Sequence, residues 1–191
     1  MISPDQRSGI GQIRLPDSES PLPVHTRHVE VVNDEQSFTA TLIVDHGDDL
    51  IRAEIKIASQ PDGAMTLSEK LTALADVTTD EIATGLIGIL NNPHWVYETG
   101  KRRITFNDKE SIIDALSGVT LSAPQASTIS IDDVLEITSD KPLGTHYRAG
   151  EKMERGRATD LLFLNHLGQQ RRWNSGEVIS EFQVQIRRIG E

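Results

Sequence analysis

The chain has 191 residues, of which 37% are hydrophobic and 4% aromatic; its net charge is −10 and it contains no cysteine. This composition allows one medium-sized domain with an aliphatic core, and it excludes disulfides, thiolate metal sites and cysteine nucleophiles. No apolar run approaches the roughly 20 residues that a membrane-spanning helix needs, and the first residues lack the basic and apolar blocks of a secretory signal. We therefore expect no membrane insertion, and a cytoplasmic protein or a component of an intracellularly assembled particle.

The charge is unevenly distributed along the chain. Residues 141–191 contain nine Lys and Arg against six Asp and Glu, so the first 140 residues carry nearly all of the acidic excess. Such asymmetry bears on association rather than on fold. It fits a solvated acidic surface, a contact with a basic partner or between copies, or mimicry of nucleic acid.

Residues 1–24 are predicted to form an extended arm rich in proline and serine. The segment shows neither a helical nor a strand period, and it cannot bury enough apolar surface to offset the entropy of ordering. A neighbouring subunit or another partner is expected to hold it, unless it packs on its own domain. The prolines are Pro4, Pro16, Pro21 and Pro23.

The clearest structural signal is a hairpin over residues 37–58. In its second half Ile51, Ala53, Ile55 and Ile57 alternate with polar residues, which predicts a strand with one apolar face. A short strand over 27–32 precedes this hairpin and makes a three-stranded antiparallel meander, and the turn residues 60–63 end it.

Two capped helices are expected next, and they are expected to cover the apolar face of the hairpin. Thr66 with Glu69 and Thr78 with Glu81 have the spacing of capping boxes, and leucine and isoleucine residues follow each at helical intervals. Asn107 is predicted to cap a third helix that ends near Gly118.

The rest of the chain is predicted as strands joined by loops. Residues 94–106 fit a second hairpin, 119–127 a loop, and 128–138 are ambiguous. Residues 140–159 are long, polar and basic, and such loops are usually functional. Strands are expected over 160–164 and 177–188. The predicted fold class is α+β: an antiparallel sheet of hairpins with about three short helices on one face, comprising an arm (1–24) and a single domain (25–191).

No stretch carries a cofactor or metal signature, and we expect none of either. The segment from Asp45 to Asp49 combines three carboxylates with His46, but it is too short to wrap a cation, for which calcium loops use about twelve residues. Its composition is that of a tight turn. The pair Gly9 and Gly11 lacks the third glycine and the preceding strand of a phosphate-binding loop.

The basic C-terminal part offers the best candidate contact surface. Arginine combined with aromatic rings favours protein anchoring, and it also suits phosphate contact and base stacking. The candidate partner-binding residues are Tyr147, Arg148, Arg155, Arg157, Arg171, Arg172 and Trp173.

These observations predict a non-enzymatic interaction or assembly subunit. It would resemble a virion, tail or secretion-machine component, or an inhibitor, and would contact a protein partner or further copies of itself through the arm and the basic loop. Two alternatives stay open. A nucleic-acid-associated protein would join residues 101–103 to Arg171 and Arg172 in one basic face. A hydrolase or transferase would bring His146 or His166 together with Arg148 and a carboxylate.

Overall fold

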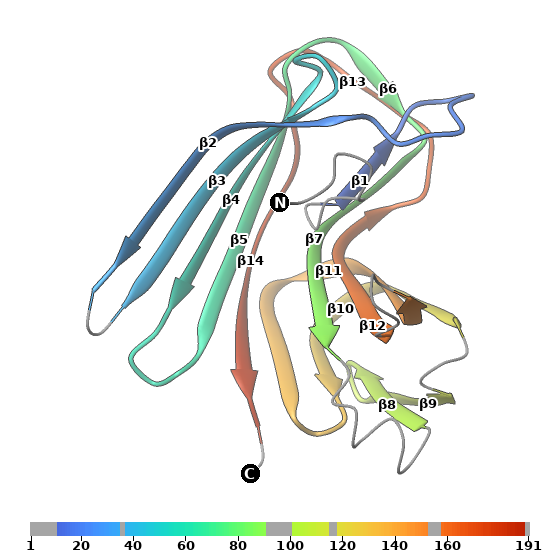
Figure 1. The fold of residues 1–191 in the computed structure, drawn as a ribbon. Coiled ribbons are helices and arrows are strands. Elements are labelled where there is room, and N and C mark those ends of the chain that lie inside the picture. Colours follow the sequence, from blue (N-terminus) through green and yellow to red (C-terminus); the bar gives the residue numbers. More distant parts are fainter. Residues whose placement is uncertain (1–10, 35–36, 91–100, 115–117, 153–157, 190–191) are drawn as a thin grey trace.

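The computed structural model describes residues 11–34, 37–90, 101–114, 118–152 and 158–189, and it is built from β-strands (Figure 1). No helix that could cross a membrane occurs in these ranges. In chain order the strands are β1 Gly11–Arg14, β2 Val24–Asn33, β3 Phe38–His46, β4 Ile51–Ser59, β5 Met65–Ala73, β6 Val77–Thr79, β7 Glu81–Leu90, β8 Lys101–Phe106, β9 Lys109–Asp114, β10 Thr120–Ile131, β11 Leu135–Lys152, β12 Ala158–Leu167, β13 Arg171–Trp173 and β14 Val178–Arg188.

One curled antiparallel sheet of 12 strands makes up most of the fold. Its order is β1-β7-β12-β11-β14-β5-β4-β3-β2, with β10, β8 and β9 continuing from β11, while β6 and β13 form a separate pair. In Figure 1 strands β2 to β5 and β14 form one wall, and β1, β7, β12, β11 and β10 form the wall facing it. The arrangement is a half-barrel resembling a β-sandwich.

Two hydrophobic clusters fill the space between the walls. One is centred on Tyr147, Leu162 and Phe182 and is closed by β8 and β10. The other packs Val44, Ile51 and other apolar residues of β3, β4 and β5 against β1, β7 and the buried Trp173 of β13. A curled sheet can therefore bury its own apolar face without any helix.

The predicted α+β class is wrong, because all three expected helices are strands. The segment from Thr66 to Leu74 shows why. Every second residue of β5 is buried: Leu67, Glu69, Leu71 and Ala73. Because Glu69 is charged, the alternation of apolar and polar residues that predicts a strand is interrupted there. Leu67, Leu71 and Leu74 consequently looked like a helical stripe.

The other two expected helices fail for local reasons. Gly85 lies in β7 with φ 64°, a conformation that disfavours a helix and suits an irregular strand. Asn107 and Asp108 both have positive φ (44° and 66°), and they form the tight turn that joins β8 to β9 instead of an N-cap.

The meander and its turns are confirmed. Strands β2, β3 and β4 pair in sequence, and residues 47–50 and 61–62 are turns. The expected strands over 160–164 and 177–188 correspond to β12 and β14. The cover of the apolar hairpin face was wrongly assigned to helices, since β1, β7 and β13 provide it.

Two segments expected to be irregular belong to the sheet. Gly11–Arg14, within the expected arm, pairs with β7 and buries Ile13 completely. Residues 140–152, expected as part of a long basic loop, lie in β11. Residues 1–10, 95–98 and 153–157 lie outside the described ranges. The division into an arm (1–24) and one domain (25–191) stays a prediction.

Candidate functional site

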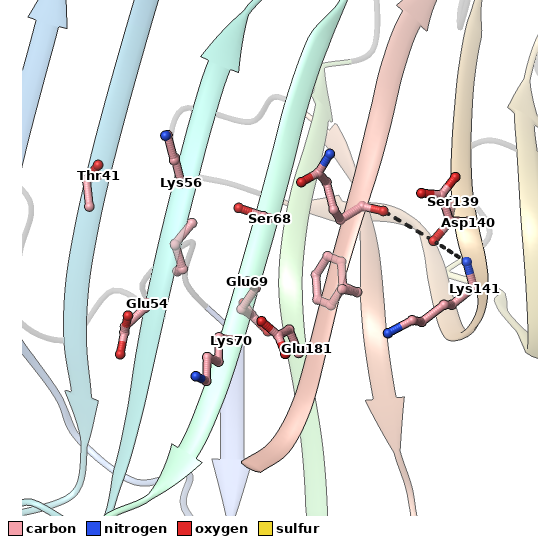
Figure 2. Close-up of a pocket in the computed structure, with 13 residues that line it drawn as sticks. Thr41, Glu54, Lys56, Ser68, Glu69, Lys70, Ser139, Asp140, Lys141 and Glu181 are labelled. Atoms are coloured by element: carbon pink, nitrogen blue, oxygen red, sulfur yellow. Dashed lines mark hydrogen bonds between the residues drawn. The ribbon is translucent and has the colours of Figure 1, made fainter.

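A polar groove lies on the face of the β3-β4-β5-β14 wall that points away from the core (Figure 2). It encloses about 530 Å³, and residues 139–141 of β11 border it on the side of β14. The lining residues are Thr41, Glu54, Ile55, Lys56, Ser68, Glu69, Lys70, Ser139, Asp140, Lys141, Glu181, Phe182 and Gln183.

Strand register arranges the outer side chains of the groove in two rows. One row runs Glu54, Lys70, Glu181 across β4, β5 and β14. The neighbouring row runs Thr41, Lys56, Ser68, Gln183 from β3 to β14. Opposite residues in adjacent strands lie within about 5.5 Å at Cβ, so each row is a continuous line of polar groups.

These groove charges are not engaged in ion pairs with one another. Within the described ranges no salt bridge involves Glu54, Lys56, Lys70, Lys141 or Glu181. At the edge of the groove, the Ser139 hydroxyl donates to the carbonyl of Gln183 at 3.3 Å, and the Lys141 amide donates to Ser139 Oγ at 3.4 Å. Figure 2 shows the Lys141 side chain extending from β11 toward β14. The groove therefore presents donors and acceptors that a ligand can use.

Beneath the groove, the sheet carries a buried carboxylate. Glu69 is 2% exposed and sits between Ile55 and Phe182 in a core-facing row. It accepts hydrogen bonds from Thr84 Oγ1 at 2.5 Å and from the Gly85 amide at 2.9 Å. Burial raises the pKa of Glu69 to about 6, against the lowering effect of these hydrogen bonds. The side chain holds the two walls together, and it does not point into the groove with the charged rows.

Two of the residues expected to anchor a partner are buried. Tyr147 is inaccessible on β11 and donates to Asp160 Oδ2 at 2.5 Å; burial, followed by this bond, raises its pKa. Trp173 is 1% exposed on β13 and its indole donates to Thr79 Oγ1 at 3.0 Å. The two rings belong to different hydrophobic clusters, so they do not form one surface.

The expected arginines are dispersed over the molecule. Arg171 stacks on the Trp173 ring at 3.9 Å and lies 3.4 Å from Glu177, while Arg172 lies 3.4 Å from Asp76. Arg148 is half-buried on β11. Arg155 and Arg157 lie outside the described residues. Partner binding by these residues stays a prediction.

The basic face required by the nucleic-acid alternative does not form. Arg102 is buried and ion-paired with Asp132 and Asp160, and Arg103 pairs with Asp133 and Glu110. Strands β8 and β13 also lie at opposite ends of the molecule (Figure 1). Paired and separated arginines make a poor site for a phosphate backbone.

The structure does bring together histidines expected in the enzyme alternative. His146 and His166 stack with ring centroids 4.5 Å apart. The Ser122 hydroxyl lies 3.0 Å from His146 Nδ1, and His166 Nε2 lies 3.3 Å from Glu81 Oε1. Burial, with the charges of His166 and Arg148, lowers the pKa of His146. Sequence reasoning missed Ser122, because residues 119–127 were expected to be a loop, whereas residues 120–127 belong to β10.

The turn after His46 is confirmed as a turn, and Asp45 has a structural role beside it. Asp45 is fully buried and accepts from Arg52 Nε at 2.8 Å and from Arg27 Nε at 2.6 Å. The hydrogen bond from Arg52, aided by Arg27 and opposed by burial, lowers the pKa of Asp45 to about 2. Its two acceptor oxygens are thus occupied by arginines.

The sequence analysis identified part of the groove lining. Glu54 and Lys56 were placed correctly on the polar face of the hairpin. Ser68 and Lys70 were assigned to a helix, so the rows that continue across β5 could not be seen. Alternation from Met65 to Ala73, with Glu69 counted as a buried position, is the signal that would have revealed them.

No protein-family model matches the sequence, and no curated protein matches it. Solved structures do match the fold. The GH36 α-galactosidase AgaA from Geobacillus stearothermophilus, in complex with 1-deoxygalactonojirimycin, has a TM-score of 0.63 at 8% identity over 95% of this chain and 30% of that one. The α-galactosidase from Lactobacillus brevis has a TM-score of 0.60 at 8% identity over 95% of this chain and 29% of that one. AgaB, also from G. stearothermophilus and in GH36, has a TM-score of 0.57 at 10% identity over 96% and 30%.

At these identities the likeness shows the fold alone: a β-sandwich-like domain that also occurs as part of larger enzymes. The chain spans about 30% of the length of AgaA. The prediction of an α+β virion or assembly component is wrong in its fold class, because the described strands form an all-β fold, and these neighbours give the assembly role no support.

Proposed function

We propose that this chain is a binding domain rather than an enzyme, and that its polar groove takes a carbohydrate chain. The observation that carries the proposal is the pair of polar rows across β3, β4, β5 and β14, whose charges form no ion pairs with one another among the described residues. Sugar hydroxyls both donate and accept hydrogen bonds. Lysines, carboxylates, hydroxyls and an amide alternate along the rows, so a chain of hydroxyl groups finds complementary partners along the whole groove.

The dimensions of the groove suit an extended ligand. From β3 to β14 it crosses three inter-strand spacings, about 14 Å in all. The strands that carry the rows are central in the sheet, which holds their side chains at fixed separations. The likeness to domains of α-galactosidases adds a fold-level analogy that is consistent with a sugar ligand.

Hydrogen bonding rather than ring stacking would dominate such binding. No aromatic side chain occurs among the strongly exposed hydrophobic residues of the described ranges. Polar groups that exchange water for sugar hydroxyls contribute only about 0.5–1.5 kcal/mol each. Binding of a single short oligosaccharide is therefore expected to be weak, and longer chains that fill the rows are expected to bind better.

Affinity electrophoresis in gels containing a soluble polysaccharide tests the proposal. A neutral galactomannan and an acidic pectin are suitable probes. Lys56→Ala and Gln183→Ala are each expected to reduce retardation several-fold, because each removes a groove donor. Lys109→Ala is the matched control, since Lys109 is an exposed lysine on β9. No retardation of the wild-type chain by either polysaccharide, or equal loss in the control, would overturn the carbohydrate ligand.

One observation favours a second candidate function, a hydrolase centred on His146. Ser122 Oγ lies within hydrogen-bond distance of His146 Nδ1, as an activated nucleophile requires. A fluorophosphonate probe tests this candidate directly. Labelling of the wild-type chain that is lost in Ser122→Ala and in His146→Asn would support it, and an unlabelled wild-type chain would exclude it.

A further inference from the structure

Strand β2 is a free sheet edge with unusual apolar exposure. It is the last strand of the sheet and pairs with β3 alone (Figure 1). Nine of its ten residues, from His25 to Asn33, are exposed. Val29, Val31 and Val32 are 59%, 58% and 54% exposed, and they are the three most exposed valines of the described ranges.

The other sheet edges are protected in the usual ways. At the opposite end β1 has four residues, and Gly11 and Ile13 in it are buried. The edge strand β9 has one strongly exposed apolar residue, Ile112 at 58%, but it also carries Lys109, Glu110 and Asp114. Short or charged edges discourage pairing with another chain, whereas long apolar edges invite it.

The central part of β2 has a geometry suited to further pairing. A register shift interrupts its pairing with β3 between Thr26 and His28, but the pairing is regular from His28 to Asn33. Val29 and Val31 lie opposite Leu42 and Ala40, so they continue the core-facing side of the sheet. His28, Glu30 and Val32 lie on the other side. This stretch contains neither proline nor lysine.

We propose that two copies of this chain pair antiparallel through β2, with a twofold axis at Val29. In a continuous sheet, residues directly opposite each other in neighbouring strands point to the same face. Core-facing residues of one copy must therefore lie opposite core-facing residues of the other. This requires the twofold axis to pass through a residue of β2 and not between two residues. An axis at Val29 places Val29 against its counterpart and places His28 opposite Glu30 of the second copy, twice. An axis at Glu30 would instead place two glutamates opposite each other, and one at Val31 would place Glu30 opposite a valine.

This pairing satisfies backbone groups as well as side chains. The outward N–H and C=O groups of an edge strand have no hydrogen-bond partner in the sheet, and a second β2 supplies such partners along the strand. The valines lose exposed apolar surface at the same time, which is favourable by about 25 cal/mol per Å². The carbohydrate proposal is independent of this one, because the groove lies over β3 to β14.

Sedimentation velocity of the full chain over a wide concentration range tests the pairing. The wild type is expected to show a monomer–dimer equilibrium, and Val29→Lys is expected to weaken it at least tenfold by placing two lysines together. Val178→Lys is the matched control, because Val178 is a 45% exposed valine on the internal strand β14. Circular dichroism confirms that each variant is folded.

A charge exchange tests the register itself. His28→Glu places glutamate opposite Glu30, and Glu30→Lys places lysine opposite His28, so each single variant is expected to weaken the dimer. The double variant restores an opposite-charge pair and is expected to recover dimerisation. A wild type that stays monomeric at all concentrations overturns the proposal, whether a different polypeptide covers the edge of β2 or the edge stays uncovered. Failure of the double variant to recover the dimer overturns it equally.

Discussion

Buried carboxylates in two parts of the molecule are satisfied in different ways. Asp45 and Asp160 are each fully buried beside arginines, whereas Glu69 is buried among uncharged donors. The pKa of Asp45 falls to about 2, while that of Glu69 rises to about 6. Burial alone therefore does not decide the charge of these groups. A neighbouring cation favours the carboxylate, and neutral donors only partly offset the cost of desolvation.

The largest effect is expected at Asp160, where both members of the ion pair are buried. The side chain of Arg102 is 9% exposed and its Nε lies 2.9 Å from Asp160 Oδ2. Asp160 also accepts from Tyr147 and from the Gly150 amide at 2.9 Å. Asp160→Asn removes the negative charge beside the buried guanidinium of Arg102 and should lower the free energy of unfolding by about 3–5 kcal/mol. Urea denaturation measures this, and a loss below 1 kcal/mol, roughly that of a surface pair, would contradict the paired description.

A large effect is also expected at Gly85, which lies beside the buried Glu69. Gly85 has φ 64° and its amide donates to Glu69. An added Cβ would lie 2.6 Å from Phe182 Cζ and 3.1 Å from Leu164 Cβ. Gly85→Ala should therefore cost about 3 kcal/mol through strain and overpacking. Gly63→Ala is the control, since Gly63 also has positive φ (81°) but its Cβ would meet no atom within 4 Å. Equal losses in the two variants would show that backbone strain alone is responsible.

A smaller loss is expected at Asp45, because its arginines reach solvent. The side chains of Arg27 and Arg52 are 45% and 37% exposed. Asp45→Asn should destabilise the fold by about 2 kcal/mol at neutral pH. The pKa of Asp45 is lowered in the folded state, so its contribution is present above its ordinary value of 3.8 and is lost as the pH falls toward 2. The variant should thus converge on the wild type in acid; a constant difference from pH 7 to 2 would contradict the role of ionisation.

The same contrast explains how much the sequence could predict. The alternation of Ile51, Ala53 and Ile55 was sufficient for the β3–β4 hairpin, because its buried positions are apolar. In β5 the buried row includes Glu69, so the pattern broke and a capping box suggested a helix. The groups that make a buried glutamate tolerable come from distant strands: the Thr84 hydroxyl donates to Glu69, and Asn165 in turn donates to Thr84. No local sequence pattern reveals these long-range contacts of Glu69. Because β5 was therefore not predicted as a strand, the part of the groove over β5 was not predicted either.

The smallest net change is expected at Glu69, and its pH dependence is the informative quantity. Glu69 has a folded pKa of about 6, above its ordinary value of 4.5, so its contribution to stability is fully present below pH 4.5 and is lost as the pH rises through 6. Glu69→Gln does not titrate and keeps one acceptor oxygen, so its stability at pH 7 should lie within about 1 kcal/mol of the wild type. The wild type should lose stability relative to this variant between pH 4.5 and 6.

The titration of His46 must be separated from that of Glu69, because burial lowers the pKa of His46 to about 4. His46 therefore alters the stability of both proteins over an overlapping pH range. Only the difference between the stability–pH curves of the wild type and Glu69→Gln isolates Glu69. A difference that is flat from pH 4 to 7 would mean that Glu69 ionises as an ordinary carboxylate. The contrast between Asp45, which lies beside arginines, and Glu69, which lies among uncharged donors, would then fail.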